Sequence, residues 1–480
     1  MQSYTKNHLN PSFFLPFMDN TNVTFIILGA TGDLAKRYLI PAIYKLVQEK
    51  KVERFAVVGV ARRPMSTQQL LGPSKEFIAD LDLNIWRKIE QNTTYHQLRF
   101  DNAQDYQKLD LTLQTIEKKY QLSGNRIFYL ATLPEHFEAI TTHLSQSGIA
   151  KQGKNTWSRL VYEKPFGDDL QSAKKINQCI AKVFDESQIY WMDHYLGKEL
   201  VGNIALVRFT NRILEPLWNK DHLESVQIIL SEKLGLEGRG EFYDKYGALK
   251  DVVQSHMLQM MALIGMESPA KITGDYIRNE KMKALKKIKV KEVILGQYDG
   301  FTKEEGVKPD SSTETFTALR LEIDNSRWKG VPFFLKTGKY LDKRETSIHL
   351  KFKMVECLLT RNCPTDSNYL TIRIQPNEGI IFEINAKVPG ETYQVSPITM
   401  EFTPHDVLGR KSPQAYENLL NLVIQGDQSV FVRNDEIEAA WKIIDEIKKR
   451  KWPIYSYAQD SKGPKELEEW SRKGKVKWRS

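Results

Sequence analysis

Short apolar runs alternate with longer mixed stretches through the first two hundred or so residues. Five runs predict buried strands because they are short and mostly apolar; they cover residues 23–28, 55–60, 126–131, 159–162 and 189–192. Helical patterns lie between them, for example over residues 33–49. Strands that alternate with helices are typical of βαβ units and predict a parallel sheet.

The pattern changes after Met192, where we place a domain boundary. Strands with few helices between them are predicted at residues 225–230, 315–323, 348–352, 369–375 and 379–384. Such a series indicates a mostly antiparallel sheet. Two helices are predicted here, over residues 248–266 and 435–449.

Composition narrows the class of protein. The 480 residues are 41% apolar and 27% charged, which is ordinary for a globular protein of about two or three domains. No stretch reaches the roughly 18 apolar residues that span a bilayer, and residues 1–20 lack the features of a signal peptide. Cys179, Cys357 and Cys363 show no zinc or disulfide spacing. We therefore expect a cytoplasmic protein without a metal and without membrane contact.

A net charge of +9 raises the question of an anionic partner. The basic residues concentrate in residues 281–291 and in the C-terminal stretches 448–450 and 462–479. No nucleic-acid-binding module accompanies them. We expect solvated helix faces or a loose end, and no binding of nucleic acid.

The first predicted strand ends in a glycine-containing turn, Gly29-Ala30-Thr31-Gly32-Asp33-Leu34. Such a turn before a helix lets a dinucleotide pyrophosphate approach backbone N–H groups. The spacing meets the GxGxxG fingerprint only in part, so a tight structural turn remains an alternative.

The second predicted strand ends near Arg62, with no acidic residue to bind a ribose 2′-hydroxyl. A guanidinium suits a 2′-phosphate and therefore favours NADP⁺ over NAD⁺. A plain surface arginine is the alternative.

Polar residues follow the last two strands of the first half. Lys164 lies in Glu-Lys-Pro-Phe-Gly, at a strand end where open α/β sheets bind ligands. The next strand is followed by Asp193-His194-Tyr195-Leu196-Gly197-Lys198-Glu199. If a helix begins there, His194 and Lys198 share a face and form a phosphate site, while Asp193 is placed to orient an imidazole.

His256 falls on an apolar helical stripe with Val252 and Met260. A histidine in such a place is often a satisfied core residue. Its alternative role is chemical, because oxidation of a hydroxyl needs a base and an imidazole with a pKa near ~6.5 suits that task.

Taken together, these motifs resemble the glucose-6-phosphate dehydrogenase family from about Val23 to about Lys449. The resemblance rests on residues 29–36, 163–167, 189–199, 238–259, 331–344 and 375–378, in this order and spacing. It implies an N-terminal Rossmann-like α/β domain that binds the dinucleotide, followed by a larger α+β domain with a mostly antiparallel sheet. We divide the chain into an extension (1–20), the NADP-binding domain (21–192), the substrate and dimerisation domain (193–455) and a basic tail (456–480).

The resemblance also implies roles. His256 is the general base at the anomeric hydroxyl and Asp193 orients it. The products are 6-phosphoglucono-δ-lactone and NADPH, and the expected assembly is a homodimer or homotetramer. The 6-phosphate contacts His194, Tyr195 and Lys198, and the sugar contacts Lys164, Glu232, Asp251, Lys339, Arg344 and Gln375. The coenzyme contacts Gly29, Ala30, Thr31, Gly32, Asp33, Leu34, Arg62 and Lys164.

Some family members carry a second, structural NADP⁺. The positions that would bind it are Glu345, His349, Ile381 and Glu383 here, with Lys336 and Arg373 beside them. Two carboxylates facing phosphates are repulsive, so we predict no structural NADP⁺.

Two other functions remain as alternatives. One is a broader group of Rossmann sugar oxidoreductases that share Glu-Lys-Pro. The other is a non-catalytic NADP⁺ sensor, although Asp193, His256, Lys164 and Lys198 are all present.

Overall fold

The computed structural model describes residues 22–354, 367–391, 394–404, 406, 409 and 411–479. They divide into two compact units: residues 22–131 with 146–159, and residues 132–145 with 160–479. The extension 1–20, Cys357 and Cys363 lie outside the described residues. Cys179 is a free thiol. The domain boundary at Met192 stays a prediction.

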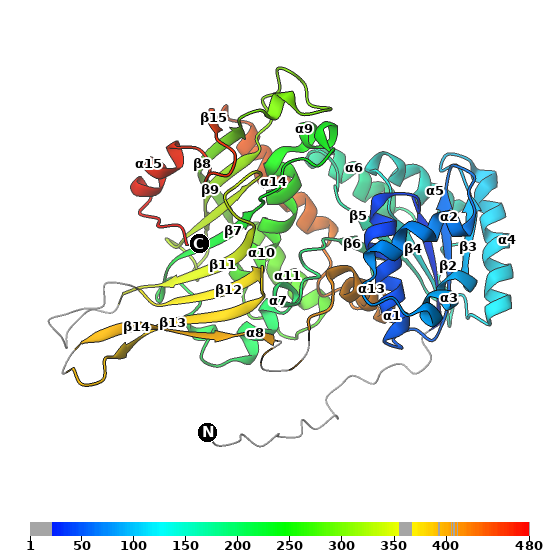
Figure 1. Ribbon diagram of the computed structural model, residues 1–480, viewed down its shortest axis with the longest axis horizontal. Coiled ribbons are helices and arrows are strands. Elements are labelled where there is room, and N and C mark those ends of the chain that lie inside the picture. The colour runs from blue at the N-terminus through cyan, green and yellow to red at the C-terminus, as the bar shows by residue number, and fades with distance from the viewer. Residues whose placement is uncertain are drawn as a thin grey trace. The chain divides into compact units, whose positions relative to one another are not determined.

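The first unit contains four parallel strands in the order β3-β2-β1-β4 (Figure 1). They are β1 (Asn22–Leu28), β2 (Arg54–Ala61), β3 (Thr93–Gln97) and β4 (Arg126–Leu130). β1, β2 and β4 confirm the apolar runs seen in the sequence. β3 was not predicted, because it is a polar edge strand in which only Thr93 is buried.

Helices follow each of these strands. The helix predicted over residues 33–49 is present as a π-helical turn, η2 (Ala35–Leu39), that continues into α1 (Ile40–Gln48). The α1 helix buries Ile43, Tyr44 and Val47 on one side, as a helix covering a sheet does. The others are α2 (Thr67–Leu71), η3 (Gly72–Phe77), α3 (Leu83–Gln91) and α4 (Ala103–Tyr120).

The second unit opens with βα elements: α5 (Phe137–Gln146), β5 (Ser158–Glu163), α6 (Leu170–Ala181) and β6 (Ile189–Met192). β5 and β6 pair in parallel, and both were predicted. The parallel strands with intervening helices confirm the Rossmann-like fold predicted for the N-terminal part of the chain.

A nine-stranded sheet forms the rest of the second unit, in the order β14-β13-β12-β11-β7-β10-β9-β8-β15. Its pairs are antiparallel except β7 with β10 and β8 with β15, so the predicted sheet is confirmed as mostly antiparallel. The strands are β7 (Leu223–Ser231), β8 (Ile288–Tyr298), β9 (Phe316–Ile323), β10 (Pro332–Gly338), β11 (Glu345–Phe352), β12 (Tyr369–Gln375), β13 (Gly379–Lys387), β14 (Val395–Phe402) and β15 (Ile454–Tyr457).

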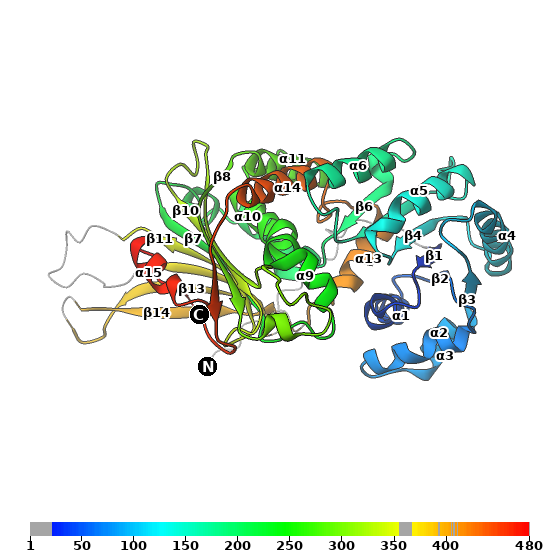
Figure 2. The ribbon, with the colours of Figure 1, turned by 90° about the horizontal axis from the view of Figure 1, so that it is seen from above.

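Both faces of this sheet are covered near β10, as the alternation of its side chains shows. Phe333 packs on Trp328, whose indole donates to the carbonyl of Gly265 at the end of α10. Phe334 points the other way and packs on Trp470 of α15. In Figure 2, α10, α11 and α14 lie together on one side of the sheet. The helices of this region are α7 (Glu199–Gly202), α8 (Ile204–Thr210), α9 (Gly240–Ala248), η7 (Leu249–Met257), α10 (Leu258–Gly265), α11 (Gly274–Leu285), α13 (Ala415–Gln425), α14 (Asn434–Lys448) and α15 (Glu466–Lys473).

Most lysines of residues 281–291 are solvated as expected, although Lys289 and Lys291 belong to β8 rather than to a helix. Lys281 is not solvated: its side chain is buried and pairs with buried Glu436 at 2.8 Å. Nor is the C-terminal stretch a loose end, because β15 joins the sheet and α15 packs Leu467 and Trp470 into a buried cluster. The apolar residues of the tail, rather than its charges, decide how it folds. No helix among the described residues is long and apolar enough to cross a membrane.

Candidate active site

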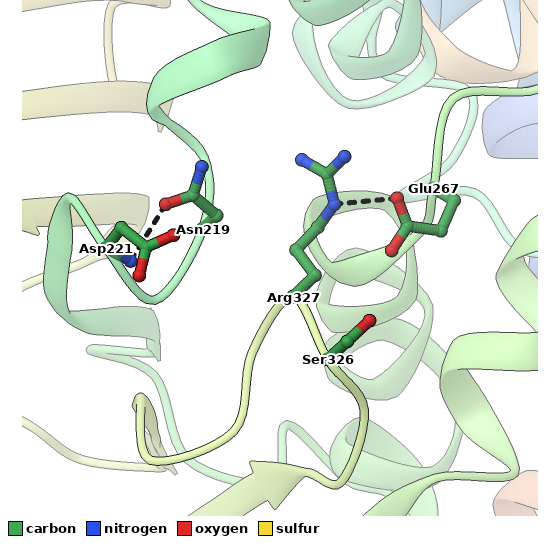
Figure 3. A pocket seen from close by; sticks show the side chains of 5 residues that line it. All are labelled: Asn219, Asp221, Glu267, Ser326 and Arg327. Carbon is green, nitrogen blue, oxygen red and sulfur yellow. Dashed lines mark hydrogen bonds and ion pairs between the residues drawn. The ribbon is translucent and has the colours of Figure 1, made fainter.

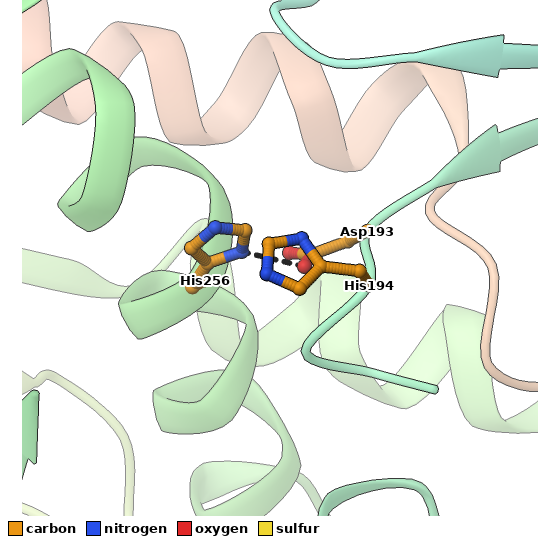
Figure 4. A group of neighbouring side chains, drawn as sticks. All are labelled: Asp193, His194 and His256. Atoms are coloured by element: carbon orange, nitrogen blue, oxygen red, sulfur yellow. Dashed lines mark hydrogen bonds and ion pairs between the residues drawn. The ribbon is translucent and has the colours of Figure 1, made fainter. Parts of the chain in front are cut away.

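A carboxylate and an imidazole meet between two elements of the second unit. Asp193 follows directly after β6, and His256 lies in the π-helical segment η7, 63 residues further along the chain. Asp193 Oδ1 lies 2.5 Å from His256 Nδ1, and both side chains are buried (Figure 4). The same oxygen accepts the backbone N–H of Tyr195 at 2.9 Å. The geometry therefore brings together the pair that the sequence singled out.

Burial and the charge interaction between Asp193 and His256 determine the protonation state of each residue. Burial alone would raise the pKa of Asp193, but His256 outweighs it and lowers that pKa to about 2. Burial lowers the pKa of His256 below its ordinary value. At neutral pH the carboxylate is ionised and only accepts, so His256 Nδ1 carries the hydrogen and Nε2 keeps its lone pair. His256 is thus a neutral base with its reactive nitrogen on the far side of the ring.

The π-helical segment η7, which carries His256, is held at its start by Glu314, a residue of the loop before β9. Gly247 has φ +62°, and a β-carbon there would meet the Glu314 side chain at 2.6 Å. The buried Glu314 carboxylate accepts the backbone N–H of Leu249, the first residue of η7, at 3.1 Å. π-Helical segments are frequent at functional sites. Glu314 could not be predicted, because an isolated glutamate forms no pattern in the sequence.

The predicted phosphate residues lie close to His256, but not on a helix. Residues 193–198 form turns, and α7 begins only at Glu199, so the idea that His194 and Lys198 share a helix face was wrong. The side chains meet in another way. The His194 and Tyr195 rings both pack on His256, at 4.8 and 4.3 Å between centroids, and the Lys198 ammonium lies 4.6 Å from the Tyr195 centroid.

Burial tunes the charges of these residues. Burial and then the nearby Arg344 lower the pKa of Lys198 to about 8. Burial and then His256 lower the pKa of His194 well below its ordinary value. At neutral pH the cluster therefore offers a cation at Lys198 and a neutral imidazole at His194. Arg344 is exposed, and Gln375 is half-buried at the end of β12, opposite Thr346 of β11.

Two lysine–carboxylate pairs complete the predicted sugar site. Lys164, just after β5, donates from Nζ to Asp251 Oδ1 at 2.7 Å and to the Asp251 carbonyl at 3.0 Å. Burial raises the pKa of Asp251, but the pairing with Lys164 outweighs it and lowers that pKa to about 2. Lys339 is buried and donates to Glu232 Oε2 at 2.6 Å. Each lysine is thus held by a carboxylate on another element.

Asp193, His194 and His256 also form a group that could hold a metal ion, with ligand atoms within 4.8 Å of one another (Figure 4). The hydrogen bond between Asp193 and His256 already occupies Asp193 Oδ1 and His256 Nδ1, two atoms that could otherwise bind a metal. The arrangement fits an oriented base better than a set of three ligands around an ion.

The predicted coenzyme turn lies in the first unit, after β1. Gly29 has φ +90°, and the N–H groups of Gly29 and Ala30 are bonded to the Val60 carbonyl. Thr31, Gly32 and Asp33 are exposed, and Leu34 is half-exposed. The N–H groups of Gly29 and Ala30 are thus used within the fold, and the exposed residues directly before the helix are the part of the turn that fits a dinucleotide pyrophosphate.

Arg62 follows β2 and is exposed, and among the described residues its guanidinium has no partner. Its backbone carbonyl accepts from Gln97 Nε2 at 2.9 Å, and the Tyr95 hydroxyl donates to the carbonyls of Ala61 and Arg63. The peptide groups beside Arg62 are therefore fixed while its side chain is left to meet a ligand, which fits a 2′-phosphate.

A separate polar pocket contains none of the predicted site residues. Its lining residues are Asn219, Asp221, Glu267, Ser326 and Arg327 (Figure 3). Arg327 is already paired there with Glu267 at 2.7 Å and with Glu215 at 3.0 Å. We do not place the substrate in this pocket.

The residues expected to exclude a structural NADP⁺ are paired with other residues of the chain. Glu345 bonds Ser347 at 2.7 Å and pairs with Lys343 at 2.5 Å, and Glu383 pairs with Arg479. Lys336 lies 4.8 Å from the centroid of Trp478. The absence of a structural NADP⁺ stays a prediction.

Comparisons with known proteins agree on one family. The model of the NAD binding domain of glucose-6-phosphate dehydrogenase matches residues 26–203, and that of its C-terminal domain matches residues 205–479. The resemblance was expected to end near Lys449, and that limit was wrong, because the match includes the folded tail. Tail residues fall in β15 and α15, so the matched C-terminal domain includes these two elements.

Individual relatives match over nearly their whole length. Glucose-6-phosphate 1-dehydrogenase of Chlamydia muridarum is 40% identical, with 95% of this chain and 96% of the relative covered. The enzyme of Bacillus subtilis is 41% identical, covering 94% and 97%. A solved structure of a glucose-6-phosphate dehydrogenase in complex with its substrate glucose 6-phosphate aligns with a TM-score of 0.88 at 32% identity, covering 96% and 99%.

Proposed function

Because the chain belongs to the glucose-6-phosphate dehydrogenase family, we propose that the buried pair of Asp193 and His256 carries out its proton chemistry. The observation that carries this is the 2.5 Å contact between Asp193 Oδ1 and His256 Nδ1. The reaction converts D-glucose 6-phosphate and NADP⁺ into 6-phosphoglucono-δ-lactone and NADPH.

In the proposed mechanism, His256 Nε2 removes the proton of the anomeric hydroxyl. As the carbonyl forms, the C–H bond at the anomeric carbon breaks and its hydrogen leaves as a hydride. The coenzyme, when bound, supplies the acceptor for this hydride. The positive charge that develops on the imidazole is stabilised by ionised Asp193, which also keeps the ring in the tautomer that leaves Nε2 free. Base and partner are both buried, so their charge interaction is strong.

Substrate binding is proposed for the residues around this pair. His194, Tyr195 and Lys198 bind the 6-phosphate, with the Lys198 ammonium as the main charge. The sugar hydroxyls contact the two lysine–carboxylate pairs, Lys164 with Asp251 and Lys339 with Glu232, which offer donors and acceptors side by side. Arg344 and Gln375 complete the sugar site.

The coenzyme is proposed to bind at the turn after β1, through Gly29, Ala30, Thr31, Gly32, Asp33 and Leu34. Arg62 binds the 2′-phosphate, and Lys164 contacts the nicotinamide side. The assembly is proposed to be a homodimer or homotetramer. A cytoplasmic location is proposed as well, since an Arabidopsis thaliana relative that is 37% identical is named cytoplasmic.

A direct assay tests the function. Protein, NADP⁺ and glucose 6-phosphate are mixed, and the absorbance of NADPH is followed. We expect turnover with glucose 6-phosphate and a much higher KM for unphosphorylated glucose, because Lys198 then has no phosphate to bind. Turnover with an unphosphorylated sugar alone would favour the broader group of Rossmann sugar oxidoreductases. Coenzyme binding without any turnover would favour a sensor.

A further inference from the structure

The C-terminal segment, to which the sequence assigned no role, reaches the backbone of a proposed sugar-binding residue. Tyr457 is the last residue of β15, which pairs in parallel with β8. Its hydroxyl donates to the carbonyl of Lys339 at 2.8 Å, although the two residues are 118 positions apart. The hydroxyl is buried, so this bond is shielded from water.

The direction of the hydrogen bond follows from the neighbouring groups. Thr315 Oγ1 lies 2.9 Å from the Tyr457 hydroxyl and accepts the backbone N–H of Tyr298 at 3.0 Å. The Tyr457 hydroxyl has one hydrogen, and the Lys339 carbonyl at 2.8 Å is nearer to it than the Thr315 carbonyl at 3.3 Å. With that hydrogen donated to Lys339, Thr315 Oγ1 is the donor to Tyr457, and a chain of hydrogen bonds results. The backbone N–H of Lys339 in turn donates to the Thr315 carbonyl at 3.0 Å. Both peptide groups of Lys339 are thereby fixed.

The Tyr457 ring has little freedom to move this hydroxyl. It packs edge-on against Phe316 and Tyr298, at 5.7 and 6.3 Å between centroids. The ring is 3% exposed and belongs to the cluster that α15 closes with Leu467 and Trp470. The hydroxyl therefore acts as a fixed point for whatever it bonds.

Fixing the backbone matters because the chain turns sharply after Lys339. Tyr340 has φ +49°, a left-handed backbone conformation that residues other than glycine adopt uncommonly. Glu232 and Leu234 bond this turn on one side, and Asp460 and Ser461 of the tail bond it on the other. The Lys339 ammonium donates to Glu232 Oε2 at 2.6 Å and lies 5.0 Å from the centroid of the Tyr243 ring.

We propose that Tyr457 is a positioning residue for Lys339, and that it holds the ammonium where the sugar hydroxyls of glucose 6-phosphate bind. Tyr457 does not touch the substrate and acts only through the backbone of Lys339. The inference rests on the proposed role of Lys339 in sugar binding. It gives the C-terminal segment a part in substrate affinity.

The test compares Tyr457→Phe with Tyr455→Phe. Tyr455 lies in the same strand, is half-buried, and has no side-chain hydrogen bond among the described residues, so it is the matched control. KM for glucose 6-phosphate, KM for NADP⁺, kcat and Tm are measured for each. We expect Tyr457→Phe to raise the glucose 6-phosphate KM about three- to tenfold while the NADP⁺ KM stays within about twofold. An equal change in both KM values, or a lower Tm with no change in KM, would overturn the proposal.

A double-mutant cycle with Lys339→Met shows whether Tyr457 acts through Lys339. If it does, Tyr457→Phe adds less than about twofold to the KM in a Lys339→Met background. Additive effects contradict the inference. If Lys339→Met itself leaves the glucose 6-phosphate KM unchanged, the proposed role of Lys339 fails instead, and the two failures are distinguished.

A second pair of variants covers the case in which Tyr457→Phe does not fold. Thr315→Val removes the hydroxyl that bonds Tyr457 but keeps the shape of the side chain, and Thr315→Ser restores the hydroxyl. We expect a raised glucose 6-phosphate KM for the first and recovery for the second. A raised KM that Thr315→Ser does not rescue counts against the hydrogen-bond chain.

Discussion

The substrate region and the coenzyme turn differ in how their side chains are held before any ligand is present. Around His256 the charged groups are already paired: Asp193 with His256, Lys164 with Asp251, and Lys339 with Glu232. At the turn after β1 the backbone is fixed, but the residues that face outward are exposed, and the Arg62 guanidinium has no partner among the described residues.

The difference follows from what each region has to do. A base must keep one tautomer and one direction through every turnover, and burial beside a carboxylate achieves this. A coenzyme that enters and leaves needs open N–H groups and a phosphate-binding side chain that reaches solvent. Substitutions of Asp193 or His256 themselves should therefore act mainly on kcat, and substitution of Arg62 should act mainly on the KM for NADP⁺.

The largest effect is expected for His256→Asn. Loss of the base should lower kcat by about 100-fold or more, while glucose 6-phosphate still binds. Steady-state kinetics and a binding titration of the variant measure the two effects. His222→Asn is the control, because His222 is exposed and lies just before β7. A kcat within tenfold of the parent would exclude His256 as the base.

Lys198→Ala should have the next largest effect, and chiefly on KM. Removing the main charge of the phosphate cluster should raise the glucose 6-phosphate KM about 10- to 100-fold, with a smaller change in the NADP⁺ KM. Lys442→Ala, an exposed lysine in α14, serves as the control. Equal losses for glucose 6-phosphate and for unphosphorylated glucose would show that Lys198 does not bind the phosphate.

Arg62→Ala tests the coenzyme region, where the proposed phosphate-binding side chain is exposed. We expect the NADP⁺ KM to rise about tenfold, the NAD⁺ KM to change little, and kcat to stay near the parent value. The exposed Arg87 of α3 provides the control variant Arg87→Ala. Since Arg62 is in solvent, the NADP⁺ KM of the parent should also increase with salt. Parallel changes for both coenzymes would contradict a 2′-phosphate role.

The pH profile should show the smallest and most graded effect. Burial lowers the pKa of His256, so the base becomes protonated only below its ordinary value of 6.5, and kcat/KM falls there as pH falls. The pKa of Lys198 is about 8, so its charge is lost as pH rises through that value, and kcat/KM for glucose 6-phosphate falls again. In Lys198→Ala the alkaline fall should vanish while the acid fall remains. An unchanged alkaline fall would assign it to another group.

Much of the fold could be predicted from hydrophobic periodicity, because the residues of β1, β2 and β6 form short apolar runs. Buried strands must be apolar on both faces, so even the four-residue β6 could be predicted. A polar strand such as β3 could not, since only its neighbour in the sheet makes it a strand. β8 was missed for another reason: its alternating lysines were interpreted as a solvated helix face or a loose end. α15 was not predicted either, because its few apolar residues, such as Leu467 and Trp470, lie in a stretch rich in lysine and arginine.

For the site, the residue types could be predicted from the sequence and its resemblance to a known family, whereas the pairing of their side chains depends on how distant segments pack. Asp193 and His256 are 63 positions apart, and only the folded chain, which places the residue after β6 beside η7, brings their atoms to 2.5 Å. Glu314 and Tyr457 had no local pattern at all, because a carboxylate that caps a helix or a hydroxyl that bonds a distant carbonyl is defined by its partner. Hydrophobic periodicity is a local property of a chain, whereas hydrogen bonds between distant segments exist only after the chain has folded.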